Sequence, residues 1–181
     1  NLSSKAILQN DVRPDDILRA LASTGADLSR FVIEVSERDI AEDVSALTQA
    51  VGYLRAAGIR VALDDFGNGH SNFELWHELC PELVKIDRYL IDGIAESAGK
   101  LAIVRALIGV AEATGAELVA EGIERFDDLL VVRDLGIRYG QGYLLGFPQA
   151  EPAMAVAIAG EGLHDRKLRV LPHSRRPTDN R

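Results

Sequence analysis

The sequence predicts an α/β fold made of repeated strand–helix units, arranged as a (β/α)8 barrel of the TIM-barrel type. Segments with apolar residues at helical spacing alternate with short apolar runs, which is the element order of parallel β/α folds. The runs are apolar on both faces, as expected for parallel strands covered by helices. No glycine-rich phosphate loop follows the first run, which disfavours a dinucleotide-binding sheet and favours the barrel.

Four of the predicted helices end at a glycine. Their apolar stripes cover residues 14–24, 44–57, 101–114 and 129–135, and a glycine follows each of them. Glycine directly after a helix supplies the left-handed conformation that closes the last turn. A shorter helix is predicted over residues 71–79.

Apolar runs after these helices predict the strands. They lie within residues 30–37, 59–65, 80–90, 116–124 and 137–146, with a stub at 1–3. Six strands are too few for a complete barrel, which needs about 250 residues. We therefore expect a first strand and helix upstream of Asn1.

Composition limits the classes of function. The chain is 47% hydrophobic and 27% charged, which is typical of a soluble globular domain. The net charge of −8 and the lack of a basic stripe in the body disfavour DNA binding. The single Cys80 excludes an intrachain disulfide framework and gives no zinc signature. No apolar run reaches the roughly 18 residues of a membrane span, so we expect a cytoplasmic domain, whose parent protein is free to be membrane-anchored.

We expect a barrel domain over residues 1–160 and a polar, basic linker over 161–181. The chain from Leu163 onward contains five Arg and two Pro with little periodicity, which is typical of a linker leaving a domain. A solvated linker is favoured over a nucleic-acid contact for this cluster.

Polar residues lie near the predicted carboxyl end of every strand. In a barrel these ends meet on one face, where active sites lie. The residues, in chain order, are Asn1, Glu34, Asp64, Asp65, Lys85, Glu121 and Gln141. The sequence therefore predicts that four carboxylates, a lysine and two amides gather at the mouth of the barrel.

Divalent cations account for such a cluster, because carboxylates a few Å apart otherwise repel each other. Oxygen ligands without Cys or His favour Mg²⁺ or Mn²⁺ over Zn²⁺. Asp64 and Asp65 cannot point the same way along a regular strand, but a turn at the strand end allows one to bridge two ions while the other binds the second. That is the two-metal arrangement for displacement at phosphorus. Lys85 is the candidate that holds or deprotonates the attacking water.

Ordinary structural roles are the alternatives. A lone Asp after a strand is more often a turn residue or a helix cap. On this alternative, Lys85 is a surface lysine, and Gln141, between two glycines, caps a strand. Acidic residues are also common at helix starts, where the helix dipole stabilises their charge, and this alternative applies to Glu37, Asp87 and Glu124. Five consecutive strands that each end in a usable polar group favour the metal site over these separate roles.

Six ordered motifs carry a resemblance to a known family. They are NLSS at 1–4, EVSE at 34–37, LDDFGNGHSN at 63–72, LVKIDR at 83–88, VAEGIE at 119–124 and GQGYLLGFP at 140–148. From Asn1 to about Pro152 the sequence resembles the EAL domain family of cyclic di-GMP phosphodiesterases. The resemblance implies a barrel that binds two Mg²⁺ or Mn²⁺ ions and hydrolyses cyclic di-GMP to linear pGpG.

The resemblance also implies the metal ligands. Asn1, Glu34 and Asp64 resemble the ligands of one ion. Asp64, Asp65 and Glu121 resemble those of the other, with Glu121 acting directly or through water. The Glu-Ala-Leu motif that names the family, whose Glu is a further ligand, is expected upstream of Asn1.

Other residues resemble catalytic and substrate-lining positions. Lys85 resembles the residue that positions or activates water, and Gln141 the residue that orders solvent or substrate. Glu37 resembles the acid that anchors the loop of residues 66–72, which links the metal site to dimerisation. Further positions at the substrate or loop are Asn68, Asp87, Arg88 and Glu124.

Three residues depart from the usual pattern of the family. Asn68 and His70 replace residues of the usual DFGTGYS motif. These replacements affect the coupling of the loop to the metal site but change none of the metal ligands. Phe147 replaces the Arg of the usual GRP and cannot supply its charge.

We therefore expect a metal-dependent phosphodiesterase whose partners are cyclic di-GMP, a second copy of the domain and neighbouring signalling domains. The alternative is a non-catalytic receptor or interaction module of EAL type. The residue at the Glu-Ala-Leu position distinguishes the two. A divalent-metal barrel acting on a carbon acid is disfavoured by the motifs.

Overall fold

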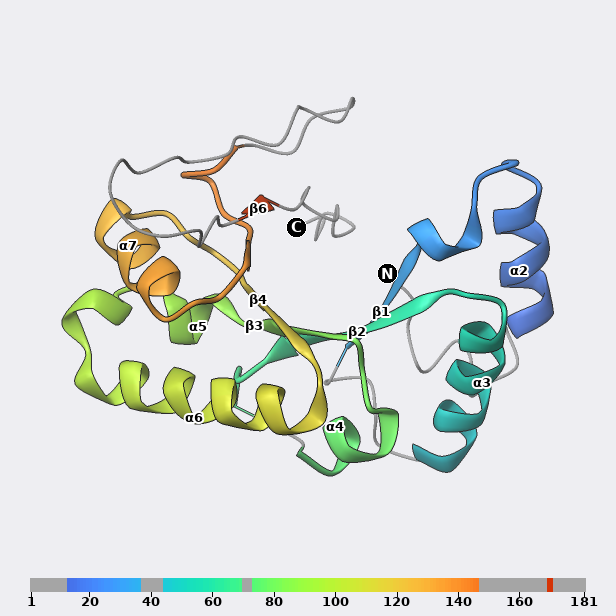
Figure 1. Ribbon diagram of the computed structural model, residues 1–181, viewed down its shortest axis with the longest axis horizontal. Helices are drawn as coiled ribbons and strands as arrows, with labels where there is room; N and C mark the ends of the chain where they lie inside the picture. Colours follow the sequence, from blue (N-terminus) through green and yellow to red (C-terminus); the bar gives the residue numbers. More distant parts are fainter. Residues whose placement is uncertain (1–12, 37–43, 70–72, 147–168, 171–181) are drawn as a thin grey trace, which may run out of the picture. The chain divides into compact units, whose positions relative to one another are not determined.

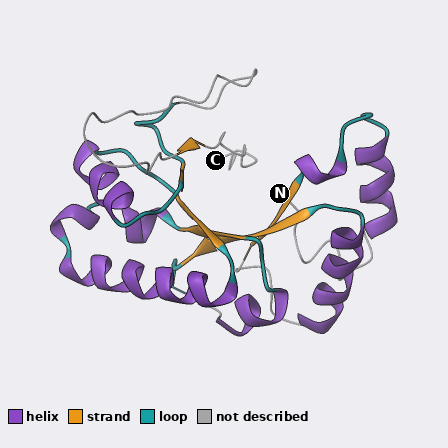
Figure 2. Cartoon of the chain, in the orientation of Figure 1, coloured by secondary structure: helices purple, strands orange, loops and turns teal. Residues whose placement is uncertain are grey.

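A computed structural model describes residues 13–36, 44–69, 73–146 and 169–170 (Figure 1). The chain divides into two compact units, residues 1–84 and 85–181, and the boundary falls inside strand β3 (Leu83–Ile86). Helices and strands alternate along the chain in each unit (Figure 2). Within the described part of the chain, none of the helices combines the length and the apolar character needed to span a bilayer.

The first unit has a parallel pair of strands at its centre. Its elements are α2 (Pro14–Ala22), η1 (Leu28–Arg30), β1 (Val32–Ser36), α3 (Val44–Ala56), β2 (Arg60–Phe66), α4 (Phe73–Leu79) and the start of β3. β1 runs parallel to β2 with Ser36 opposite Asp64, and β3 is the next strand after β2. Side chains from β1, β2 and α3, including Val35, Leu63 and Leu54, are shielded from solvent and form the core.

The second unit continues the same alternation. Its elements are the end of β3, α5 (Arg88–Ile91), η3 (Ile94–Glu96), α6 (Ala98–Thr114), β4 (Glu117–Ala120), α7 (Phe126–Asp134), β5 (Tyr139–Gly140) and β6 (Arg169–Val170). The strands β3, β4, β5 and β6 are neighbours in that order, and the pairs β4–β5 and β5–β6 are parallel. Buried Asp128 ties α7 to the segment before α6, because its carboxylate accepts the N–H groups of Gly93 and Ala95, both at 3.0 Å.

The predicted alternation of helices and strands is confirmed for the described residues. Gly115 ends α6 in the left-handed conformation, with φ 77°, as the sequence predicts. The strand predicted within 137–146 is wrong in length, because only Tyr139–Gly140 belongs to the sheet. The chain turns after this point, and the N–H of Leu144 donates to the carbonyl of Ile123 instead of continuing a ladder.

The sequence does not predict two of the short elements. α5 is one turn long, too short for helical periodicity, and is capped by Asp87, whose carboxylate accepts the N–H of Tyr89 at 2.7 Å. β6 comprises Arg169–Val170 and lies in the segment predicted as a linker, and two residues show no strand period. The predicted stub at 1–3 lies outside the described residues.

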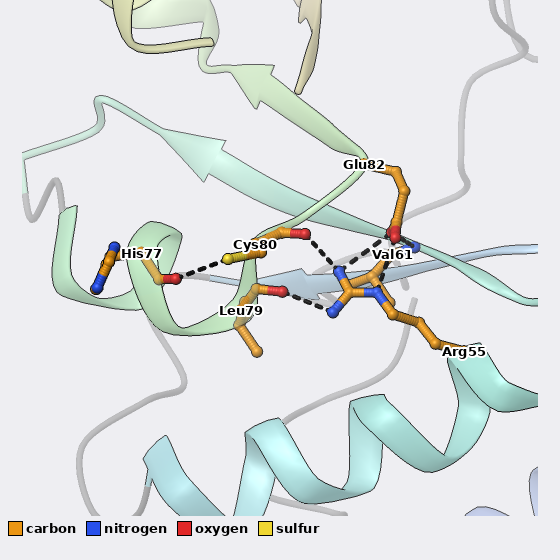
Figure 3. Close-up of polar contacts among 6 residues, drawn as sticks. All are labelled: Arg55, Val61, His77, Leu79, Cys80 and Glu82. Carbon is orange, nitrogen blue, oxygen red and sulfur yellow. Dashed lines mark hydrogen bonds and ion pairs between the residues drawn. The ribbon is translucent and has the colours of Figure 1, made fainter. Parts of the chain in front are cut away.

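An ion pair between Arg55 and Glu82 fastens α3 to the strands of the first unit (Figure 3). Burial alone raises the pKa of the Glu82 carboxyl, but hydrogen bonds from Arg55 and from the N–H of Val61, with the positive charge of Arg55, lower this pKa below its ordinary value. A carboxyl whose pKa is lower in the folded than in the unfolded state stabilises the fold above its unfolded pKa, and this stabilisation is lost as the pH falls through the folded pKa.

Glu82→Gln is therefore expected to lower the free energy of unfolding by about 1 kcal/mol at pH 7, a value discounted for the partial exposure of the pair. The difference from wild type shrinks as the pH falls below about 4.3, the ordinary pKa of Glu, because the wild-type carboxyl then takes up a proton. Urea unfolding of both proteins between pH 3 and 7 measures it. A difference that stays constant over this range would contradict the assignment.

Candidate metal centre

Two adjacent carboxylates, Asp64 and Asp65, lie at the carboxyl end of β2. The strand residues before them, Val61 to Leu63, are apolar and buried, and the two aspartates are themselves only 7% and 6% exposed. A carboxylate oxygen of Asp64 lies within 4.8 Å of one of Asp65. The side chain of Asp64 also accepts the N–H of Asp65 at 3.0 Å, which holds one of its oxygens in place.

A left-handed residue brings these two carboxylates together. Side chains alternate along a regular strand, so neighbours point to opposite faces. Asp65 has a φ of 61°, which breaks the alternation at the strand end. The turn predicted from the DD pair is confirmed. A left-handed backbone costs about 1–2 kcal/mol for a residue other than glycine, and such strain is concentrated at functional positions.

Glu34 adds a third carboxylate to the same end of the first unit. It lies on β1 opposite Ala62, and Ser36, two residues later, lies opposite Asp64. Because side chains two residues apart share a face, Glu34 and Asp64 lie on the same face of the β1–β2 pair. The Oε2 atom of Glu34 is buried. The first unit thus supplies three acidic side chains from neighbouring strand ends.

A lysine–glutamate pair lies at the strand ends of the second unit. Lys85 on β3 and Glu121 directly after β4 form an ion pair, with Nζ and Oε1 2.8 Å apart and side-chain exposures of 4% and 16%. The backbone N–H of Glu121 donates to the carbonyl of Ile86 at 3.0 Å, which fixes it beside β3. Lys85 is therefore a buried, paired residue, and the surface-lysine alternative is wrong.

Gln141 follows β5 and is 5% exposed. Its N–H donates to the carbonyl of Ala120 at 2.8 Å, and its own carbonyl accepts the N–H of Ile123 at 3.0 Å. The next residue, Gly142, packs so closely that a Cβ there would lie 2.1 Å from the carbonyl oxygen of Ile123. The backbone around Gln141 is thus held against the segment that follows Glu121.

The remaining predicted residues of the second unit pair with one another or cap a helix. Arg88 makes two contacts with Glu124, at 2.8 and 3.1 Å, and its aliphatic stem packs on the backbone at Gly122. Asp87 caps α5, which matches the helix-start alternative for that residue. Glu124 does not, because α7 begins at Phe126 and Glu124 bonds to Arg88 instead. The sequence gives no sign of this pair, whose members are 36 residues apart.

Other predicted residues lie at or beyond the limits of the described chain. The N–H of Asn68 donates to the carbonyl of Asp65 at 3.4 Å and forms the turn that opens the predicted loop. Asn1, Glu37, His70 and Phe147 lie outside the described residues.

The donors of the first unit fit a hard divalent cation. Glu34, Asp64 and Asp65 offer only carboxylate oxygens, which Mg²⁺, Mn²⁺ and Ca²⁺ accept readily. Two buried carboxylates so close together repel each other unless positive charge offsets the repulsion. These residues therefore suit a metal that takes oxygen ligands, as predicted.

Comparison with known proteins decides the family. A model of the EAL domain matches residues 1–148 of the chain. The chain belongs to the EAL domain family. The cyclic di-GMP phosphodiesterase PA2567 of Pseudomonas aeruginosa is 32% identical to this EAL domain over 134 residues, which are 74% of this chain and 23% of that protein.

Solved structures confirm the predicted EAL-type α/β barrel fold. The crystal structure of the EAL domain of Mycobacterium smegmatis DcpA matches with a TM-score of 0.76 and 30% identity, over 81% of this chain and 66% of that one. Klebsiella pneumoniae BlrP1, in a complex with manganese and cyclic di-GMP, matches with a TM-score of 0.68 and 32% identity, over 74% of this chain and 35% of that one. The chain spans only 17, 18 and 24% of the lengths of three further curated relatives.

Proposed function

We propose that this EAL domain, within its full protein, hydrolyses one phosphodiester bond of cyclic di-GMP to give linear pGpG with the help of two divalent cations. One observation carries the proposal: two adjacent, buried carboxylates at the end of β2 are turned toward each other by the left-handed Asp65. A site that only binds guanines and phosphates has no need of clustered carboxylates. The relative named as a cyclic di-GMP phosphodiesterase supports the same reaction.

We assign the metal ligands as the resemblance implies. Asn1, Glu34 and Asp64 would hold one ion, and Asp64, Asp65 and Glu121 would hold the other. We propose Mg²⁺ or Mn²⁺ as the ions. Manganese and calcium complexes of BlrP1 support a divalent cation of this kind. When bound, the two ions lower the pKa of a water molecule and stabilise the negative charge that develops on the phosphate.

Three side chains are assigned to hold water, substrate and a loop beside these ions. Lys85, held by its ion pair with Glu121, would hold the attacking water as a hydrogen-bond donor, and it would take up the proton of this water only in its neutral form. Gln141, whose backbone is bonded on both sides, orders solvent or substrate beside them. Glu37 anchors the loop of residues 66–72.

We propose that four polar residues line the substrate or its loop. Arg88 is the member that presents a positive charge, and its two contacts with Glu124 hold the guanidinium in one orientation. Asp87 acts on the same residue indirectly, because it starts the helical turn on which Arg88 lies. The full set is Asn68, Asp87, Arg88 and Glu124.

The partners are proposed on the same basis. We expect a homodimer formed through this domain, neighbouring signalling domains in the full protein and a cytoplasmic location. Gel filtration of the full protein with light scattering measures the dimer directly.

Product analysis tests the proposed reaction. The full protein with cyclic di-GMP and Mg²⁺ or Mn²⁺ is expected to form pGpG, identified by liquid chromatography and mass spectrometry. Removal of the metal with EDTA is expected to lower the rate by about a thousandfold or more, because the ions supply both the activated water and charge stabilisation. Restoring Mn²⁺ is expected to restore the rate.

Two outcomes of this assay would contradict parts of the proposal. Lys85→Ala is expected to lower turnover by about a hundredfold or more while metal remains bound, so unchanged turnover would remove Lys85 from its role. Tight binding of cyclic di-GMP without any pGpG, in protein with metal bound, would favour the receptor function instead.

A further inference from the structure

A network centred on Arg55 reaches β2 at Val61, the second residue of that strand (Figure 3). Arg55 lies near the end of α3, and its guanidinium donates to the carbonyls of Leu79 and Cys80, each at 2.7 Å. It also contacts both carboxylate oxygens of Glu82, at 2.8 and 3.2 Å. One side chain thus joins the end of α3, the end of α4 and the residue before β3.

Glu82 transmits this contact to β2. Its carboxylate accepts the N–H of Val61 at 2.8 Å, and its own N–H donates to the carbonyl of Val61 at 3.1 Å. Two hydrogen bonds to one residue fix which residue of β2 lies beside the start of β3. A slip of one residue in a strand moves every side chain to the other face, so this pairing determines the register.

The pairing is placed where the register matters for the proposed site. Asp64 comes three residues after Val61 on β2, and Lys85 comes three residues after Glu82 on β3. Asp64 and Lys85 therefore lie equally far along the sequence from the hydrogen bonds that join Arg55, Glu82 and Val61. We call these hydrogen bonds the lock. A shift at these contacts moves Asp64 by the same number of residues relative to the start of β3.

The end of α4 needs the guanidinium. Cys80, which follows the last residue of the helix, has a φ of 43°, the left-handed conformation that glycine usually supplies at this position. The last carbonyls of a helix have no partner within it, and Arg55 bonds to two in this region. Lysine has one nitrogen and cannot reach two carbonyls and a carboxylate at once, so the geometry requires arginine.

We propose that Arg55 and Glu82 are positioning residues that hold the start of β3 in register against β2 and thereby place the carboxylates at the end of β2. The effect of these residues on the metal site rests on the proposed function. The lock itself is defined by contacts within the first unit. It acts through the strands, since Arg55 lies near the end of α3 and Glu82 lies before the first residue of β3, away from the carboxyl ends of the strands.

The test compares Arg55→Lys with Val104→Ala in the full protein. Val104 is fully buried in α6, and its truncation lowers global stability without touching the lock. Hydrogen–deuterium exchange of residues 62–66 and 83–85 is the first measurement, and the dissociation constant for Mn²⁺ is the second. Both measurements are made under conditions in which each variant is fully folded, so that global unfolding does not account for a difference in exchange or in Mn²⁺ affinity.

Arg55→Lys is expected to speed exchange in these segments by about tenfold relative to Val104→Ala, because local opening no longer needs to break the lock. It is also expected to weaken Mn²⁺ binding by about tenfold, at the low end of the range for residues that support metal ligands. Glu82→Gln, which removes the charge and one of the two oxygens that Arg55 contacts, is expected to show both effects. If Arg55→Lys matches Val104→Ala in exchange and in Mn²⁺ affinity, the residues are merely structural and the proposal is wrong.

Failure of the proposed function has a different signature. Wild-type protein that binds no Mn²⁺ would overturn the metal site. The exchange measurement would then still decide whether Arg55 controls the strands. Altered exchange with unchanged Mn²⁺ affinity in a metal-binding protein would overturn the positioning role alone.

Discussion

Replacing Asp64 by Asn is expected to lower the turnover of cyclic di-GMP by about a hundredfold or more, since a bridging ligand of both ions loses its charge. The fold is expected to persist, because the amide oxygen of Asn still accepts the N–H of Asp65 that Asp64 accepts at 3.0 Å. Initial rates of pGpG formation at saturating Mn²⁺, with the unfolding temperature measured in parallel, separate the two effects.

Asp134→Asn is the matched control for this experiment. Asp134 ends α7, is two-thirds exposed and forms a surface ion pair with the adjacent Arg133. A surface pair of this kind contributes about 0–1 kcal/mol, so activity and stability are expected to stay near wild type. Full activity in Asp64→Asn would show that Asp64 does not bind a catalytic ion.

Gly142→Ala is expected to lower the free energy of unfolding by about 3 kcal/mol or more, which for a chain of this size is about 6–12 °C in unfolding temperature. A Cβ at this position would lie 2.1 Å from the carbonyl oxygen of Ile123 and 2.3 Å from its nitrogen. Backbone atoms cannot move aside as a flexible side chain does, so the two segments must separate. Because Gln141 is the adjacent residue, turnover is expected to fall as well.

Gly109→Ala provides the control with the same substitution. Gly109 lies on the exposed side of α6, and a Cβ there meets nothing within 4 Å. Alanine is the better helix former, so this variant is expected to gain about 0.5–1 kcal/mol. Differential scanning calorimetry of both variants measures the contrast. Equal stability of Gly142→Ala and wild type would show that the close approach to Ile123 is wrong.

Features that repeat along the chain were predictable from the sequence. The helices α3 and α6 were predictable because apolar residues recur at helical spacing from Val44 and from Leu101 until a glycine. Asp64 and Lys85 stand out because each interrupts or ends an apolar run, and the structure places both at buried strand ends. The DD pair even predicts the backbone turn, since two neighbours on a strand cannot share a face.

Features that depend on contacts between distant residues were not predictable. The pairs Arg88–Glu124 and Arg55–Glu82 join residues 36 and 27 positions apart, and neither leaves a periodic trace in the sequence. The abrupt end of β5 follows from the close packing of Gly142 on Ile123, which only the folded chain reveals. Single-turn α5 and two-residue β6 are too short for any period to develop.

Counting the Mn²⁺ ions bound by the full protein in equilibrium dialysis tests the central claim most directly. The claim is that Asp64 bridges two ions. Wild-type protein is predicted to bind two Mn²⁺ per chain in the presence of cyclic di-GMP, and Asp64→Asn to bind at most one, with weaker affinity. Two ions bound equally tightly by Asp64→Asn, or none bound by wild type, would contradict it.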